Sequence, residues 1–309
     1  MGRIVNSVLE LIGNTPLMRL NRVTDDCGAS ILAKLEFLNP TGSIKDRIAL
    51  SMIEAAEKEG IIKPGSTIIE ATSGNTGIGL SFVAAAKGYK MIVVMPEVMS
   101  MERRMVMKMY GADLVLTPAK DFVEGSCKKA KELAKQTDGF CPDQFANPAN
   151  VAAHRIRTGQ EIWEQTDGKV DGFVAGVGTG GTLIGVAETL KEKNPRVVIA
   201  AVEPAESPVM SGGKSGSHRI EGIGDGFIPD IIARARDLVD EVITIKDEDA
   251  IRMTHRLIRE EGLFVGISSG ANVLAAMQLG KKLGKGRTIV TVLPDNAYRY
   301  FSTDLFKDI

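Results

Sequence analysis

The sequence predicts an α/β protein with open, twisted, mostly parallel sheets flanked by helices. Short apolar segments typical of buried strands alternate with longer segments that have the apolar spacing or the alanine content of helices. The alternation occurs in two series, separated by a turn near residue 150. At 309 residues the chain is long enough for two such domains, each with its own core.

The first series follows a short N-terminal part. Residues 1–40 contain a helical pattern around 5–12, a turn at 13–16 and an apolar strand at 31–35. The elements expected after it are helix 44–59, strand 67–70, helix 76–88, strand 90–95, helix 100–110, strand 113–117 and helix 123–136. Because helices separate consecutive strands, we expect these strands to run parallel.

The second series begins after the turn at Asn147–Asn150. Its expected elements are helix 151–165, strand 172–175, helix 182–191, strand 197–202, helix 248–261, helix 270–279 and strand 288–293. A stretch rich in glycine, serine and proline, 204–226, interrupts the series. Such a composition is typical of a loop.

Composition excludes several classes of function. The net charge is −1 and charges of both signs are interspersed, which gives no electrostatic pattern for nucleic acid. No apolar run approaches the roughly 20 residues of a membrane span, and the N-terminus lacks the apolar core of a signal peptide. The cysteines, Cys27, Cys127 and Cys141, are far apart, and neither they nor the histidines have metal-ligand spacing. We therefore expect a reduced, cytoplasmic protein without a metal site.

The stretch Asn39–Arg47 places a lysine at a helix start. A turn cluster ends at Ser43, which has the chemistry of an N-cap, so Lys45 falls in the first turn of the following helix. A cation there opposes the helix dipole. Lys45 is either an ordinary solvated lysine or a lysine of lowered pKa that forms a Schiff base with a carbonyl cofactor. This stretch alone does not decide between them.

A glycine-rich loop, Gly176–Thr182, follows an expected strand and opens an expected helix. Glycines in such a loop let backbone N–H groups close on a phosphate at the positive end of the helix. The loop also fits G-x-G-x-x-G, and Glu203 ends the next strand, which together match a dinucleotide-binding pattern. The hydroxyls beside the glycines suit a single phosphate monoester at least as well.

Two further junctions between elements carry hydroxyl groups. Thr72–Gly77 offers three side-chain hydroxyls and an amide at a second helix N-terminus, which is a suitable site for a carboxylate. Gly266–Gly270 precedes an alanine-rich helix and by itself is no more than a capping sequence.

Taken together, these motifs resemble the cysteine synthase (O-acetylserine sulfhydrylase) family of fold-type II pyridoxal phosphate enzymes, to which cystathionine β-synthase is closely related. The resemblance covers almost the whole chain. Besides the stretches above, it includes Ile12–Leu17, Met95-Pro96, Gln144–Pro148, Val202–Pro204, Glu221–Gly224 and Arg299-Tyr300. It implies a fold like the tryptophan synthase β subunit, with a smaller domain at 41–151, a larger one from 1–40 and 152–309, and the active site in the cleft between them.

The resemblance also implies roles for individual residues. Lys45 would form the Schiff base with pyridoxal 5'-phosphate, Asn75 would bond the ring hydroxyl of the cofactor, and Ser268 would meet its pyridine nitrogen. The cofactor phosphate would be held by Gly178, Thr179, Gly180, Gly181 and Thr182. The α-carboxylate of the substrate would be bound by the residues Thr72, Ser73, Gly74, Thr76 and Gln144, and Gly224 would lie in a segment facing the amino acid.

The implied reaction is the formation of L-cysteine from O-acetyl-L-serine and sulfide. Lys45 would remove the α-proton, acetate would leave to give an aminoacrylate, and sulfide would add to its β-carbon. A hydroxyl at position 268 leaves the pyridine neutral, and the weaker electron sink suits direct β-elimination. The resemblance further implies a homodimer and docking of the C-terminal tail of serine acetyltransferase.

One departure from the family pattern bears on the reaction. Asp225 stands where the usual residue is small and apolar. It is either a solvated loop acid or a carboxylate near the reacting carbons that sets specificity, for example for releasing sulfide from cysteine. Condensation of serine with homocysteine, as in cystathionine β-synthases, stays open as an alternative. An NAD-dependent oxidoreductase is a more distant one.

Overall fold

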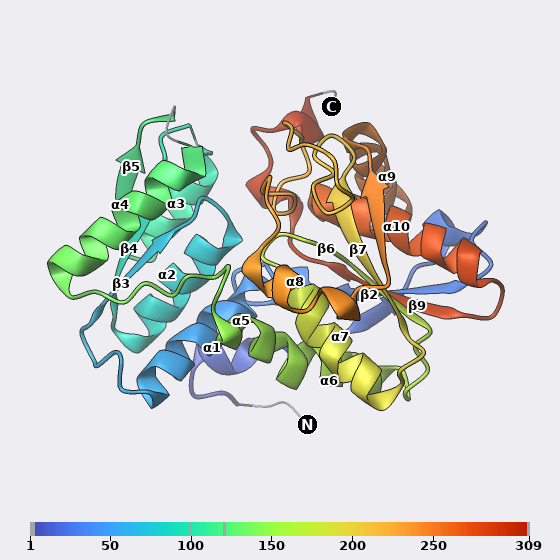
Figure 1. The fold of residues 1–309 in the computed structure, drawn as a ribbon, viewed down its shortest axis with the longest axis horizontal. Coiled ribbons are helices and arrows are strands. Elements are labelled where there is room, and N and C mark those ends of the chain that lie inside the picture. Colours follow the sequence, from blue (N-terminus) through green and yellow to red (C-terminus); the bar gives the residue numbers. More distant parts are fainter. Residues whose placement is uncertain (1–3, 99, 120–121, 308–309) are drawn as a thin grey trace. The chain divides into compact units, whose positions relative to one another are not determined.

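The computed structural model describes residues 4–98, 100–119 and 122–307 (Figure 1). The chain forms two compact units. The first contains the chain up to Ile12 and residues 39–150, and the second contains 13–38 and the chain from Val151 onward. The resemblance implied that residues 1–40 belong to the larger domain; the structure groups the residues up to Ile12 with the first unit and 13–38 with the second. The short helix η1 (Val8–Leu11) contacts α2 (Asn75–Lys87) of that unit.

The first unit has a three-stranded parallel sheet in the order β3-β4-β5. Its strands are β3 (Thr67–Ala71), β4 (Lys90–Pro96) and β5 (Asp113–Thr117). Besides α2, its helices are α1 (Lys45–Lys58), α3 (Met101–Met109) and α4 (Phe122–Thr137). Helix α4 buries Ala130 against Ile69 and Val94 of the sheet. Since strand side chains alternate, Glu70 faces away from this cluster.

The second unit has a six-stranded sheet in the order β1-β2-β9-β6-β7-β8, parallel except for the β1–β2 pair. The strands are β1 (Leu17–Arg19), β2 (Ser30–Leu35), β6 (Gly172–Gly176), β7 (Val198–Pro204), β8 (Glu241–Ile245) and β9 (Thr288–Leu293). The central strands are nearly continuous apolar runs because helices cover both faces of a parallel sheet.

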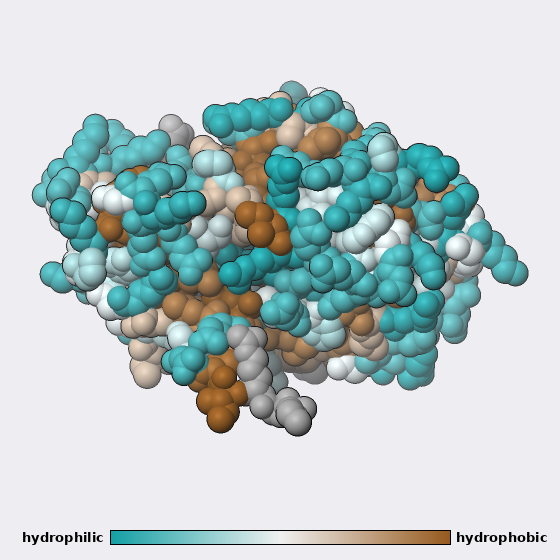
Figure 2. Space-filling model, turned by 90° about the horizontal axis from the view of Figure 1, so that it is seen from below, coloured by the Kyte–Doolittle hydropathy of each residue, from teal (hydrophilic) through white to brown (hydrophobic). Residues whose placement is uncertain are grey.

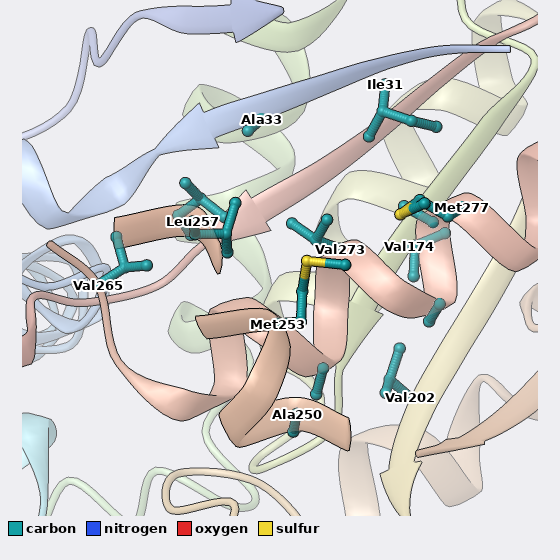
Figure 3. Close-up of a cluster of buried hydrophobic side chains, with 14 of the residues drawn as sticks. Ile31, Ala33, Val174, Val202, Ala250, Met253, Leu257, Val265, Val273 and Met277 are labelled. Atoms are coloured by element: carbon teal, nitrogen blue, oxygen red, sulfur yellow. The ribbon is translucent and has the colours of Figure 1, made fainter. Parts of the chain in front are cut away.

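The two faces of this sheet carry separate cores. On one face Val174 and Val202 pack with α9 (Asp247–Glu261) and α10 (Ile267–Leu283), as Figure 3 shows. On the other face Phe173 and Val290 pack with α6 (Gly159–Gln165) and α7 (Gly181–Lys193). The neighbouring residues Phe173 and Val174 therefore serve opposite cores, as strand alternation requires.

The predicted fold class is confirmed, with local corrections. The predicted helix 151–165 consists of α5 (Pro148–Ala153), a π-helical turn (His154–Thr158) and α6. Strands β1 and β8 and the short helix α8 (Asp230–Arg234) were not predicted. Within the described residues, no helix is both long and apolar enough to cross a membrane.

Candidate functional site

Lys45 is the first residue of α1, and its surroundings hold the helix start firmly. The predicted N-cap Ser43 lies one residue too early, because Ile44 occupies the cap, but the Ser43 hydroxyl accepts a bond from the Lys45 N–H at 3.3 Å. The buried Asp46 accepts the N–H of Thr41 at 2.7 Å. A Cβ added at Gly79 of α2 would lie 3.1 Å from the Lys45 carbonyl oxygen, so α2 packs closely on this turn. Lys45 is therefore presented from a fixed backbone.

The loop between β3 and α2 brings together the residues predicted to bind a carboxylate. Helix α2 begins at Asn75, and its N-cap is Gly74, which has no side chain to accept the first N–H groups of the helix. Thr72 accepts the Gly74 N–H at 3.3 Å. The Thr76 hydroxyl donates to Oε1 of Gln144 at 2.6 Å, although the two residues are 68 positions apart. The loop thus offers hydroxyls and an amide at the positive end of a helix, where an anion is stabilised.

Gln144 is held in place by residues that the sequence analysis missed. The carboxylate of Glu70 in β3 accepts the backbone N–H groups of Asp143 at 3.0 Å and Gln144 at 3.4 Å. The Asn150 amide donates to the Gln144 carbonyl oxygen at 2.8 Å. Burial raises the pKa of Glu70 to about 8, against the two N–H bonds, which lower it. A charged residue inside an apolar strand was the available sequence signal.

The glycine-rich loop joins β6 to α7 and packs so closely on its surroundings that glycine is required at Gly178. A Cβ at Gly178 would lie 2.5 Å from the carbonyl oxygen of Gly222, and Gly180 has a φ of 86°. The Thr179 hydroxyl accepts the Gly181 N–H at 3.4 Å. The loop ends at the start of α7, where backbone N–H groups are not used by the helix. Glycines, hydroxyls and a helix N-terminus fit the phosphate of a cofactor.

Thr182, in the first turn of α7, is oriented by a histidine that was not singled out from the sequence. Nε2 of the buried His154 lies 3.2 Å from the Thr182 hydroxyl oxygen. Nδ1 of the same ring lies 3.0 Å from the Thr158 hydroxyl oxygen. His154 begins the π-helical turn, a rare local form that is frequent at functional sites.

The contacts of Glu203 differ from those that a dinucleotide-binding pattern predicts. Its carboxylate is 3% exposed and accepts the backbone N–H groups of Met210 at 2.7 Å and Ser211 at 2.9 Å. The Ser211 hydroxyl also donates to it, at 2.5 Å. The acid that should meet a ribose is thus committed to a turn, which argues against the oxidoreductase alternative.

Ser268 lies in the first turn of α10 and is 3% exposed. One turn further along the helix, Oδ1 of Asn272 accepts the Gly176 N–H at 2.8 Å, and its Nδ2 donates to the Val292 carbonyl oxygen at 2.9 Å. Asn272 therefore ties the helix that carries Ser268 to the strand that leads into the glycine-rich loop.

The segment with Gly224 and Asp225 lies against the same loop. The Gly224 N–H donates to the Val177 carbonyl oxygen at 2.9 Å, and Nε2 of His218 lies 2.8 Å from the Gly224 carbonyl oxygen. The side chain of Asp225 is exposed, and its Oδ2 is 3.8 Å from the position of a Cβ on Gly178. Asp225 is thus both solvated and close to the predicted phosphate site.

The predicted site residues fall into two groups. Lys45, the Thr72–Thr76 loop and Gln144 belong to the first unit, and the glycine-rich loop, Ser268 and Gly224-Asp225 belong to the second. In the described part of the chain, no three His, Cys, Asp or Glu residues gather as they would around a metal ion.

A lysine fixed at a helix start and a glycine-rich loop with hydroxyls at a helix N-terminus, both on α/β units, fit an enzyme that uses a phosphorylated carbonyl cofactor. The family profile described as "Pyridoxal-phosphate dependent enzyme" matches residues 8–295, and the chain belongs to this family.

Individual relatives are similar over nearly the whole chain. A cysteine synthase of Staphylococcus aureus (strain N315) is 53% identical over 303 residues, which cover 98% of this chain and 97% of the relative. A cysteine synthase structure from Entamoeba histolytica has a TM-score of 0.95 at 47% identity, covering 99% of this chain and 91% of that one. A hydrogen sulfide-producing enzyme from Fusobacterium nucleatum has a TM-score of 0.92 at 44% identity, covering 97% and 99%.

Proposed function

We propose that the protein forms L-cysteine from O-acetyl-L-serine and sulfide by β-replacement, with pyridoxal phosphate as its cofactor. The observation that carries this is the anion site at Thr72–Thr76 and Gln144, which shares a unit with Lys45. An amino acid held by its carboxylate and a lysine amine that can accept its α-proton are what this reaction needs. Relatives named cysteine synthase support the choice of reaction.

The cofactor would be held by groups from both units. Lys45 and Asn75 come from the first unit, and the glycine-rich loop and Ser268 come from the second. Residues Gly178, Thr179, Gly180, Gly181 and Thr182 would bind the phosphate. The Ser268 hydroxyl would donate to the pyridine nitrogen, and Asn75 to the ring hydroxyl.

The residues of this chain would do the following work. Bound pyridoxal phosphate supplies an electron sink for the α-carbon of the amino acid. Thr72, Ser73, Gly74, Thr76 and Gln144 hold the substrate carboxylate. The Lys45 Nζ takes the α-proton while the bond from the β-carbon to the acetate oxygen breaks. After sulfide has bonded to the β-carbon, Lys45 returns the proton to the α-carbon.

The experiment is a visible spectrum with cysteine formation measured in parallel. The wild-type protein should bind pyridoxal phosphate with a visible absorption band and form cysteine from O-acetylserine and sulfide. Lys45→Ala should lose the band and at least 1,000-fold of the activity, on the order of what removal of a covalent nucleophile costs. Lys58→Ala, at the exposed end of the same helix, is the matched control. A Lys45→Ala protein with normal activity would refute the proposal.

Release of sulfide from cysteine is a second candidate, favoured by Asp225. Its carboxylate lies near the loop that would hold the phosphate, and a structural relative is named as a hydrogen sulfide-producing enzyme. Asp225→Ala should then change the ratio of cysteine formation to sulfide release by several-fold. Asp230→Asn, which removes another exposed acid, should leave the ratio alone. An unchanged ratio in Asp225→Ala would leave Asp225 as a solvated loop acid.

A cytoplasmic homodimer that accepts the C-terminal tail of serine acetyltransferase is also part of the proposal. Apolar side chains gather on the face in Figure 2, and Ile4 is 93% and Leu11 51% exposed. A contiguous exposed apolar patch, unlike scattered apolar residues, favours burial against a second copy. Sedimentation should give a mass of two chains, and a peptide with the tail sequence should inhibit turnover. A monomer, or a peptide without effect, would remove the corresponding part.

A further inference from the structure

We infer that Glu70 is a positioning residue for substrate binding: the oxygens of its carboxyl group fix the Asp143–Gln144 backbone so that the Gln144 amide can bond the carboxylate of the amino acid. The inference rests on the proposed function, because it takes the Thr72–Thr76 loop as the site of that carboxylate. Glu70 itself does not touch the substrate in this proposal. It acts through Gln144.

The first step is the turn that Glu70 holds. Asp143 has a φ of 53°, in the left-handed region that costs energy for a residue with a side chain. Its carbonyl oxygen accepts the N–H groups of Ala146 at 3.1 Å and Asn147 at 3.0 Å, which closes the following turn. The N–H groups of Asp143 and Gln144 point the other way, to Oε2 and Oε1 of Glu70. The carboxylate therefore holds a backbone that would otherwise relax.

The second step is the orientation of the Gln144 side chain. Its Oε1 accepts the Thr76 hydroxyl at 2.6 Å, and its backbone oxygen accepts the Asn150 amide at 2.8 Å. Because the amide oxygen is engaged by Thr76, the amide presents its N–H donors to a ligand. A carboxylate accepts such donors. A shift of the Gln144 backbone would break this alignment at the start of α2.

The third step is the effect of the buried Glu70 on the stability of the fold. Glu70 is 3% exposed, and in the described part of the chain it has no cationic partner. Burial of this carboxyl group raises its pKa to about 8, so the folded protein has to keep it protonated at neutral pH, which lowers the stability of the fold. Residues that lower stability are retained where function needs them. The substrate-binding role of the turn supplies such a need.

Glu203 in the second unit provides a matched control. It is also 3% exposed and also accepts two consecutive backbone N–H groups, those of Met210 and Ser211. Its turn does not contain Gln144 or Thr76. Glu203→Gln therefore tests the general cost of removing a buried carboxylate that holds a turn.

The experiment compares Glu70→Gln, Glu203→Gln, Gln144→Ala and the double variant of Glu70 and Gln144 as holoenzymes. In Glu70→Gln the side-chain NH2 group replaces one of the two acceptor oxygens. It then faces a backbone N–H, and that hydrogen bond is lost. We expect KM for O-acetylserine to rise about tenfold, as for one lost hydrogen bond, with kcat changed less than about threefold and the cofactor absorption unchanged. Glu203→Gln should leave KM within about twofold. The double variant should have the KM of Gln144→Ala alone, since Glu70 acts through that residue.

Two further measurements keep the inference testable. Amide hydrogen exchange in the segment 139–147 should accelerate in Glu70→Gln whether or not the reaction is the proposed one. Glu70→Asp, which keeps the carboxyl group on a shorter side chain, should have an intermediate KM. A normal KM in Glu70→Gln beside a raised KM in Gln144→Ala would overturn the inference, as would additive effects in the double variant. If the wild type makes no cysteine, the proposed function fails, and unchanged exchange in Glu70→Gln would separately refute the role of Glu70 in holding the turn.

Discussion

The two helix-start loops of this protein are built for anions in different ways. The Thr72–Thr76 loop of the first unit uses side chains, with Thr76 bonded to Gln144 and Gln144 braced by Glu70. The Gly176–Thr182 loop of the second unit uses backbone, and Gly178 approaches the Gly222 carbonyl too closely for any side chain. One loop would bind its anion through side chains that residues distant in sequence position, and the other through a backbone that close packing fixes.

The difference matches what each loop is proposed to hold. A cofactor phosphate stays through many turnovers, so a rigid backbone cradle suits it. A substrate carboxylate must bind and leave in every cycle, and side-chain donors whose positions depend on other residues can be tuned for that exchange. The comparison predicts that damage to the second loop removes the cofactor, whereas damage to the first raises KM.

The largest expected effect is that of Gly178→Ala. The added Cβ would lie 2.5 Å from the Gly222 oxygen, a backbone atom that cannot move aside cheaply. We expect the affinity for pyridoxal phosphate to fall at least 100-fold, since a shift of the loop would misplace several donors together. Titration of the apo-protein, followed by the cofactor absorption, measures this.

Gly74→Ala is the corresponding change in the other loop. An added Cβ there meets nothing within 4 Å, and Gly74 has an ordinary negative φ of −109°. Cofactor affinity should change less than about threefold. Equal losses of cofactor affinity in Gly178→Ala and Gly74→Ala would contradict the proposed difference between a loop that binds through its backbone and a loop that binds through positioned side chains.

The next effect is a dependence of stability on pH that comes from Glu70. Burial raises its pKa to about 8 from 4.5, so between these values the folded protein binds the proton that the unfolded chain has released. Because the folded state binds more protons than the unfolded state in this range, the free energy of unfolding falls as pH rises, by up to about 1.4 kcal/mol per pH unit. The fall ends above the pKa of the folded state. Below pH 4.5 both states are protonated and the group contributes no slope.

Neighbouring groups do not reverse the direction of this pH dependence. Asp143 raises the pKa of Glu70 further, and Cys141, whose own thiol pKa burial raises to about 12, stays neutral. Lys131 lowers the pKa of the Cys141 thiol, which remains above this pH window. Denaturant unfolding between pH 5.5 and 8.5 should give a smaller loss for Glu70→Gln than for wild type. Parallel pH curves would show that Glu70 is not the group concerned.

The sequence was enough to predict the fold class because strands and helices alternate with clear patterns along the chain. It was less informative about short elements. Strand β8 has five residues, mostly half-buried, and α8 has five, so neither gives a periodic signal of useful length. The π-helical turn at His154–Thr158 continues a helical pattern and is invisible to it.

The candidate site shows the same limit more sharply. The hydroxyls at Thr72 and Thr76 and the glycines at 176–181 lie at junctions between elements, where local pattern identifies them. The partners that brace them are distant in sequence, Glu70 by 74 positions from Gln144 and Asn272 by 96 from Gly176. The local pattern also left Glu203 as a candidate acid of a dinucleotide-binding site, and its contacts with the turn at Met210 argue against that alternative.

The smallest expected loss of function is that of Thr76→Val, which removes a side-chain hydroxyl from the first loop without touching the second. Valine keeps the shape of threonine but removes the hydroxyl that donates to Gln144 Oε1. The amide of Gln144 then loses its fixed orientation, and a buried oxygen loses one bond, which costs about 1 kcal/mol. We expect KM for O-acetylserine to rise about five- to tenfold with cofactor affinity unchanged. Thr166→Val, at the end of α6, is the control, because its buried hydroxyl donates to the backbone oxygens of Ile162 and Trp163. A loss of cofactor in Thr76→Val, with KM unaffected, would mean that the first loop serves the cofactor and that the two loops do not differ as proposed.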